Sequence, residues 1–221
     1  MSVRGKVAIE LSVLALLTVA FLLLFPRRPP VVDMGLGCFA VACLLLSAGY
    51  TKKVIWAATP PPVVEHRLKR CVNVTLWMTV PAMLLFLLIG MFLGYQSRGW
   101  AGAMDRVFNW RIVAAFGFYL AWALVQQTLF QYYLLGRLLA LFPKKHPAVP
   151  VAITGAAFAL VHLPDCWTTL ATIPAGIAWC FLYYRYRCLL PLAFSHAALG
   201  STFYYGLFDH DLAVEWRAIL P

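Results

Sequence analysis

Three short segments of this chain place polar side chains inside long apolar runs, where they can take part in acid-base or hydrogen-bond chemistry. The first segment, VQQTLFQ, holds Gln126, Gln127 and Gln131. Polar groups within a membrane-spanning helix are costly and usually face the interior of a helix bundle or a cavity. Residues four apart share one helical face, so we expect the amides of Gln127 and Gln131 to hydrogen bond to each other.

The other two segments each contribute a histidine. His162 lies in FALVHLPD, and His196 lies in SHAALGS. Asp165 follows His162 by three residues, beyond a proline that turns the chain. Its carboxylate can therefore orient the His162 imidazole as a base, much as a carboxylate does in hydrolytic triads.

Each of these residues also has a purely structural interpretation, because a buried Gln or His in a helix bundle often serves only to hydrogen bond to a neighbouring helix. The complete set favours a site, since two imidazoles and a pair of amides are expensive to keep for packing alone. If the apolar runs alternate across a membrane, Gln126, His162 and His196 lie within the membrane or at its edge on nearby helices. We expect them to converge on one cavity.

The composition indicates a membrane protein. Hydrophobic residues make up 63% of the chain and charged residues only 12%, against about 45–50% and 25% in soluble domains. The net charge of +10 comes from short basic clusters between apolar runs, which is typical of topology-setting residues beside anionic lipid headgroups. We therefore expect the lipid bilayer, and not a nucleic acid, as a partner.

The apolar runs predict an all-α, polytopic bundle of about seven transmembrane helices. The runs are Val7–Phe25, Met34–Tyr50, Val74–Tyr95, Ile112–Leu135, Val149–Leu163, Trp167–Tyr184 and Leu189–Phe208. The loop 51–70, with three consecutive prolines and a basic patch, is the clearest linker. It predicts a division into residues 1–71, two amino-terminal helices and this loop, and residues 72–221, a membrane-embedded core.

The distribution of Lys and Arg predicts the orientation in the membrane. With seven spans, the amino terminus and the even-numbered loops carry 12 of the 18 basic residues, and the odd-numbered loops with the carboxyl tail carry 6. Basic residues favour the cytoplasmic side. A multi-pass protein with a cytoplasmic amino terminus is expected.

The sequence indicates no cofactor. Its six cysteines form no CxxC pair and show no spacing typical of a metal site. Zinc bound by His162 and His196 is possible but disfavoured, because the helix of Gln126 offers no carboxylate as a further ligand.

The ordered set of segments resembles the CAAX prenyl protease and bacteriocin-processing family of intramembrane peptidases. The family motifs are Glu-Glu-x-x-x-Arg, Phe-x-x-x-His, and His-x-x-x-Asn or Asp. Here FALVH, ending at His162, matches the second motif. The three segments together keep the order and spacing of the family motifs over residues 112–208. The resemblance implies that the positions of Gln126, Gln127, His162 and His196 form the site, with the first acidic residue and the first His activating water and the later His steadying the oxyanion.

The departures from the family motifs leave several functions open. Gln126 cannot accept a proton at neutral pH, and Gly200 stands where the family has Asn or Asp. The first hypothesis is an intramembrane endopeptidase that cleaves a membrane-associated protein, with His162 and Asp165 supplying the base. The second is a catalytically impaired pseudoprotease that acts as a membrane scaffold, maturation factor or immunity factor. The third is a small transporter whose Gln and His residues line a polar path.

Overall fold

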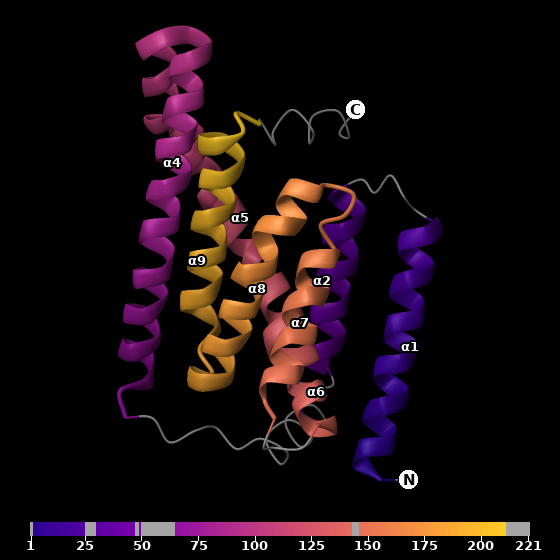
Figure 1. Cartoon of the computed structure of the whole chain (residues 1–221). Coiled ribbons are helices and arrows are strands. Elements are labelled where there is room, and N and C mark those ends of the chain that lie inside the picture. Colours follow the sequence, from indigo (N-terminus) through magenta and orange to yellow (C-terminus); the bar gives the residue numbers. More distant parts are fainter. Residues whose placement is uncertain (1, 25–29, 47–48, 50–64, 143–145, 211–221) are drawn as a thin grey trace. The chain divides into compact units, whose positions relative to one another are not determined.

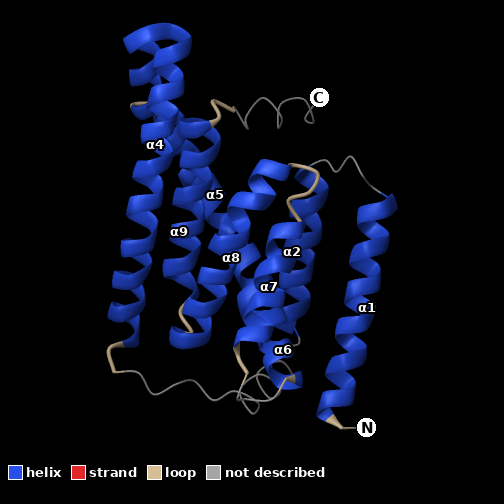
Figure 2. Ribbon diagram, viewed as in Figure 1, coloured by secondary structure: helices blue, strands red, loops and turns tan. Residues whose placement is uncertain are grey.

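The computed structural model of the 221-residue chain describes residues 2–24, 30–46, 49, 65–142 and 146–210. Every regular element in these ranges is a helix, and none of them contains a strand (Figure 2). The all-α prediction is therefore confirmed. Residues 51–64 of the predicted linker lie outside the described residues.

Helices occupy the described part of all seven apolar runs, because a backbone in apolar surroundings must satisfy its own hydrogen bonds. In chain order the helices in Figure 1 are α1 (Val3–Leu24), α2 (Pro30–Leu46), α4 (Arg67–Val107), α5 (Trp110–Gln127), α6 (Gly136–Leu141), α7 (Ala148–Leu160), α8 (Cys166–Tyr186) and α9 (Leu189–Ser201). Two π-helical segments continue α5 and α9, namely η1 (Thr128–Leu135) and η2 (Thr202–Leu207).

Three helical stretches are long and apolar enough to cross a membrane, judged by length and composition: Arg67–Val107, Trp110–Leu141 and Cys166–Tyr186. Val32–Leu46 and Ala148–Leu160 are shorter apolar helices. Such stretches indicate an integral membrane protein.

The chain divides into two compact units. The first comprises Met1–Glu65 and Gln126–Arg187. Within it α7 and α8 pack against each other along their lengths, as Figure 1 shows. Helix α1 packs on α6 and α2 packs on η1, so both amino-terminal helices contact the stretch that follows Gln126. The predicted division into residues 1–71 and the membrane-embedded core of residues 72–221 stays a prediction.

The second unit comprises His66–Val125 and Cys188–Pro221. In it α4 lies along α9 and η2 (Figure 1). Two contacts show how closely these helices approach. The hydroxyl oxygens of Thr79 and Ser195 are 2.6 Å apart, and a Cβ built on Gly90 would lie 2.0 Å from the carbonyl oxygen of Gly206.

Helix α4 contains a turn that its apolar run does not reveal. Arg98 and Gly99 depart from helical geometry, and Gly99 takes a φ of 61°, a conformation that glycine adopts without steric cost. Gly94 and Gly102 meet across the turn, since a Cβ on Gly94 would lie 2.5 Å from the Gly102 carbonyl oxygen. The run predicted to end at Tyr95 corresponds to the helix before this turn.

Candidate functional site

The amide-bearing segment is buried. Gln126 is 9% exposed, and Gln127 and Gln131 are fully buried. The π-helical segment η1 begins at Thr128, directly after Gln127. π-Helical turns are rare and occur frequently at functional sites, where the extra residue changes the direction of nearby side chains. The first segment singled out by the sequence therefore coincides with an unusual backbone.

The hydrogen bonding of the amides differs from the expected pairing of Gln127 with Gln131. Nε2 of Gln131 donates to Sγ of Cys180 on α8, at 3.7 Å. The pairing prediction is wrong for Gln131, because η1 alters the rotation between residues 127 and 131 and a thiol from α8 lies within reach. Among the residues that the structure describes, Oε1 of Gln126 and Oε1 of Gln131 accept no hydrogen bond. Buried polar atoms of this kind are uncommon and suit binding to water or a ligand.

The second segment places its histidine in the turn directly after α7. Nδ1 of His162 lies 3.0 Å from the carbonyl oxygen of Phe158. The Phe158 ring is fully buried and packs edge-on against Phe130 of η1 and Trp179 of α8. Phe158 thus connects His162 to the segment that follows the glutamines.

Asp165 caps helix α8. Its carboxylate accepts hydrogen bonds from the backbone N–H groups of Trp167 and Thr168, at 3.0 and 3.1 Å, and from the Thr168 hydroxyl. These are the unsatisfied donors of a helix start, and a carboxylate there is stabilising. The capping interaction is a structural role that the sequence analysis did not foresee.

The third segment lies in the second unit. His196 on α9 is 3% exposed, and its ring meets the ring of Tyr119 on α5 in a T-shaped contact with centroids 5.7 Å apart. On α5, Tyr119 and Ala123 are four residues apart, so they share one helical face. Tyr119 was not among the predicted site residues, since an aromatic residue in an apolar run carries no signal of its own.

The structure thus brings Gln126, Gln127, His162 and Asp165 into the first unit and His196 into the second. Within the first unit, Phe158 joins His162 to η1. The convergence of all these residues on one cavity stays a prediction.

A partly buried ion pair in the first unit was missed by the sequence analysis. Nε of Arg137 lies 3.2 Å from both carboxylate oxygens of Glu10, and the Tyr133 hydroxyl donates to Oε1 of Glu10 at 2.5 Å. The charge count treats Arg137 as a loop residue, which is a correction, because the structure places it in α6 at 1% exposure. The signal was present in Glu10, a lone acidic residue inside the first apolar run.

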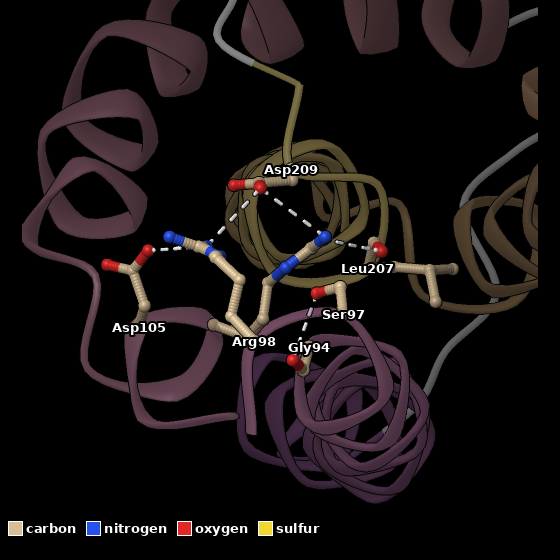
Figure 3. Close-up of polar contacts among 7 residues, drawn as sticks. Gly94, Ser97, Arg98, Asp105, Leu207 and Asp209 are labelled. Carbon is tan, nitrogen blue, oxygen red and sulfur yellow. Dashed lines mark hydrogen bonds and ion pairs between the residues drawn. The ribbon is translucent and has the colours of Figure 1, made fainter. Parts of the chain in front are cut away.

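A second polar cluster holds the end of η2 in the second unit. Figure 3 shows Arg98 between Asp105 and Asp209, with nitrogen-to-oxygen distances of 2.9 and 3.8 Å. Arg106, 11% exposed, donates from Nη1 to the Leu207 carbonyl at 2.9 Å and lies 3.4 Å from Asp209. Arginine is favourable at the carboxyl end of a helix, where carbonyl groups lack partners.

No group of three or more His, Cys, Asp or Glu side chains within the described ranges can hold a metal ion. His162 and His196 would need further ligands for zinc. Zinc binding by these two histidines therefore stays disfavoured.

Residues 107–202 match the family model described as type II CAAX prenyl endopeptidase Rce1-like. The matched residues cover less than half of the chain and include all three polar segments. The match confirms the family resemblance predicted from the motifs. No curated protein and no solved structure matches the chain.

Proposed function

We propose, from the premise that residues 107–202 form an Rce1-like domain, that this protein is an intramembrane endopeptidase that cleaves a membrane-associated protein. One observation carries the proposal: the matched residues contain buried polar side chains at each of the two outer motif positions, Gln126 with Gln127 and, later, His196. A peptide backbone entering a bilayer needs hydrogen-bond partners, and such side chains can supply them.

The hydrogen bond of His162 supports a role as the base. A carbonyl oxygen can only accept, so the neutral imidazole donates from Nδ1 to Phe158 and carries its lone pair on Nε2. In the proposed reaction Nε2 takes a proton from water while the water oxygen attacks the scissile carbonyl carbon. The proton then passes to the leaving amine nitrogen as the C–N bond breaks. His196 donates a hydrogen bond to the oxyanion.

The carboxamides fit substrate and water positioning. Oε1 of Gln126 accepts no hydrogen bond from the described part of the chain, so it is suited to accept from the attacking water or from a substrate N–H. The NH₂ group of the same amide can donate to a peptide carbonyl. An amide orients these groups without taking up a proton.

A second candidate function, a catalytically impaired relative that binds a membrane segment without cutting it, is favoured by a separate observation. The carboxylate of Asp165 is engaged by the first turn of α8, and Gln126 replaces the acidic residue of the family motif. Loss of a positioned general base lowers a rate by about 10²- to 10⁴-fold. A protein of this kind acts by binding a membrane segment without cleaving it, as a scaffold, maturation or immunity factor.

The test is a cleavage assay with purified protein in lipid vesicles, using membrane-anchored protein substrates with and without a prenyl group. We expect cleavage that the His162→Ala variant loses and that the His196→Ala variant retains only at a low, measurable rate, with both variants still unfolding cooperatively. Tight binding of the same substrates without cleavage identifies the impaired relative. Absence of both binding and cleavage refutes a peptidase-type site.

We also propose the seven-span topology with a cytoplasmic amino terminus. It is supported by the contacts of α4, because Thr79 pairs with Ser195 and Gly90 meets Gly206 eleven residues further along each helix. Helices α4 and α9 are therefore parallel, which in a bilayer requires an odd number of crossings between them. Reporter fusions at the two chain ends should lie on opposite sides, with the amino terminus inside. Reporters on one side contradict the count.

A further inference from the structure

The glycine at position 200 leaves room for an aromatic ring. A Cβ built on Gly200 would lie 2.7 Å from Cε1, 3.2 Å from Cδ1 and 3.3 Å from Cζ of Tyr119. Cβ atoms essentially never approach another heavy atom to under 3.0 Å. Glycine also weakens a helix interior relative to alanine, so the Tyr119 ring is the feature of the fold that accounts for its presence in α9.

The same ring contacts His196. The centroids of the Tyr119 and His196 rings are 5.7 Å apart at an interplanar angle of 82°. His196 and Gly200 are four residues apart on α9 and share one helical face. The Tyr119 ring therefore lies along this face, between the imidazole and the position where a side chain on residue 200 would project.

The surroundings of Tyr119 restrict its movement. Ala123, Ala193 and Ala197 are fully buried where α5 meets α9, and Tyr119 packs against this cluster. The Tyr119 ring is partly buried, and these packed alanines limit the room for a different rotamer on their side of the ring. The imidazole of His196, at 3% exposure, is correspondingly confined.

We propose that Tyr119 is a positioning residue that fixes the orientation of the His196 imidazole, and that Gly200 is the position that admits it. Edge-to-face ring contacts have a preferred geometry, so the Tyr119 ring selects one orientation of the imidazole. The kinetic consequence rests on the proposed function, because it concerns the hydrogen bond from His196 to the oxyanion. The ring contact between Tyr119 and His196 does not rest on the proposed function.

The contact is tested first by stability in detergent, as a double-mutant cycle. Gly200→Ala should lower the unfolding temperature of the parent, and should leave it unchanged or raise it in a Tyr119→Ala background, where the clash is gone. Gly117→Ala is the matched control on α5, because a Cβ there meets no atom within 4 Å. An equal loss from Gly200→Ala in both backgrounds overturns the proposal.

The positioning role is tested by nuclear magnetic resonance of ¹⁵N-histidine, with the His196 signals assigned by their loss in His196→Ala. The parent and Tyr119→Phe, which keeps the ring, should each show one narrow pair of His196 ring nitrogen signals. Tyr119→Leu should broaden or double them, because the imidazole then samples several orientations. A narrow single pair in Tyr119→Leu overturns the proposal whether or not the protein cleaves anything.

The kinetic arm uses the substrate that the parent cleaves. Tyr119→Leu should lower kcat by about two- to tenfold with KM unchanged, and should cause no further loss in a His196→Ala background. A loss of equal size in both backgrounds indicates a role in packing alone and overturns the proposal. If the parent cleaves no substrate, the proposed function fails, and the stability and resonance measurements still decide the positioning role.

Discussion

Arg137 of α6 and Glu10 of α1 form an ion pair in which Nε of the arginine lies 3.2 Å from each carboxylate oxygen. Arg137 is 1% exposed and Glu10 is 29% exposed. A guanidinium in such a place is charged. The stability of the folded protein therefore depends on the partner carboxylate. The pair fixes the first helix of the chain to the helix that continues from Gln126 and Gln127.

Removing one member of this pair should cost more than removing both. Glu10→Leu leaves a buried guanidinium without its carboxylate and should lower the free energy of unfolding by about 3 kcal/mol, the low end for a buried pair. The double variant Glu10→Leu, Arg137→Leu should recover most of this loss, because two apolar side chains need no partner. Unfolding titrations in mixed micelles measure the stability of the single and the double variant. A double variant as unstable as the single one contradicts a stabilising ion pair.

Close backbone contact between α4 and η2 predicts a large loss of stability when Gly90 is substituted. Gly90→Ala should lower the free energy of unfolding by about 3 kcal/mol or more, because its Cβ would lie 2.0 Å from the Gly206 carbonyl oxygen and a backbone atom cannot move aside cheaply. Gly35→Ala is the matched control, since nothing lies within 4 Å of its added Cβ. The control should be neutral or stabilising by up to about 1 kcal/mol.

The sequence predicts the helices well because their signal is local. Each apolar run gives a helix, and the family match covers the segments that hold His162 and His196. The contacts that define the surroundings of these residues are not local. Glu10 and Arg137 are 127 residues apart in the sequence. No local sequence pattern near either residue indicates that the other is its partner.

Two further features depend on tertiary packing. The π-helical segment η1 lies in an apolar stretch, Thr128–Leu135, that is equally compatible with an ordinary α-helix. Gly200 could be read from the sequence only as a missing Asn or Asp, because the Tyr119 ring that occupies the space beside it comes from another helix. The capping role of Asp165 was predictable in principle, since Asp before a helix is a frequent N-cap.

Substitutions of Arg106 and Arg98 should differ in their effects on stability. Arg106→Gln should lower the free energy of unfolding by about 1–3 kcal/mol, because the residue is only 11% exposed and its hydrogen bond to the Leu207 carbonyl is charge-assisted. Arg98→Gln should cost less than about 1 kcal/mol, because both Arg98 and Asp105 are more than half exposed. Denaturant titration compares them. Equal losses would show that Arg106 does not hold the end of η2.

Substitutions of Asp165 separate capping from catalysis. Asp165→Ala should destabilise the protein by about 1 kcal/mol through loss of the N-cap, whereas Asp165→Asn should preserve stability because asparagine caps equally well. If Asp165 also orients His162 as a base, Asp165→Asn should lower kcat at unchanged stability. Parallel measurement of unfolding temperature and cleavage rate distinguishes the roles. Full activity in Asp165→Asn limits the carboxylate to capping.

The last prediction concerns Gln126, where an amide stands at the position that the family fills with an acid. Gln126→Glu is nearly isosteric, so packing around this 9% exposed side chain should change little. The new carboxyl group can take a proton from water, which an amide cannot do. If the parent lacks a base, the variant should create or raise cleavage by about 10²- to 10⁴-fold, and His162→Ala should abolish the gain.

The matched control is Gln131→Glu, which introduces the same carboxyl group on the same stretch of helix, at another fully buried position beside Cys180. It should not raise cleavage, because residue 131 stands at the Arg position of the family motif and not at the position of the acidic residue that activates water. A gain in both variants would point to a general effect of charge. If the parent already cleaves and Gln126→Glu is no faster, the base is His162 as proposed, and Gln126 positions water or substrate through its amide alone.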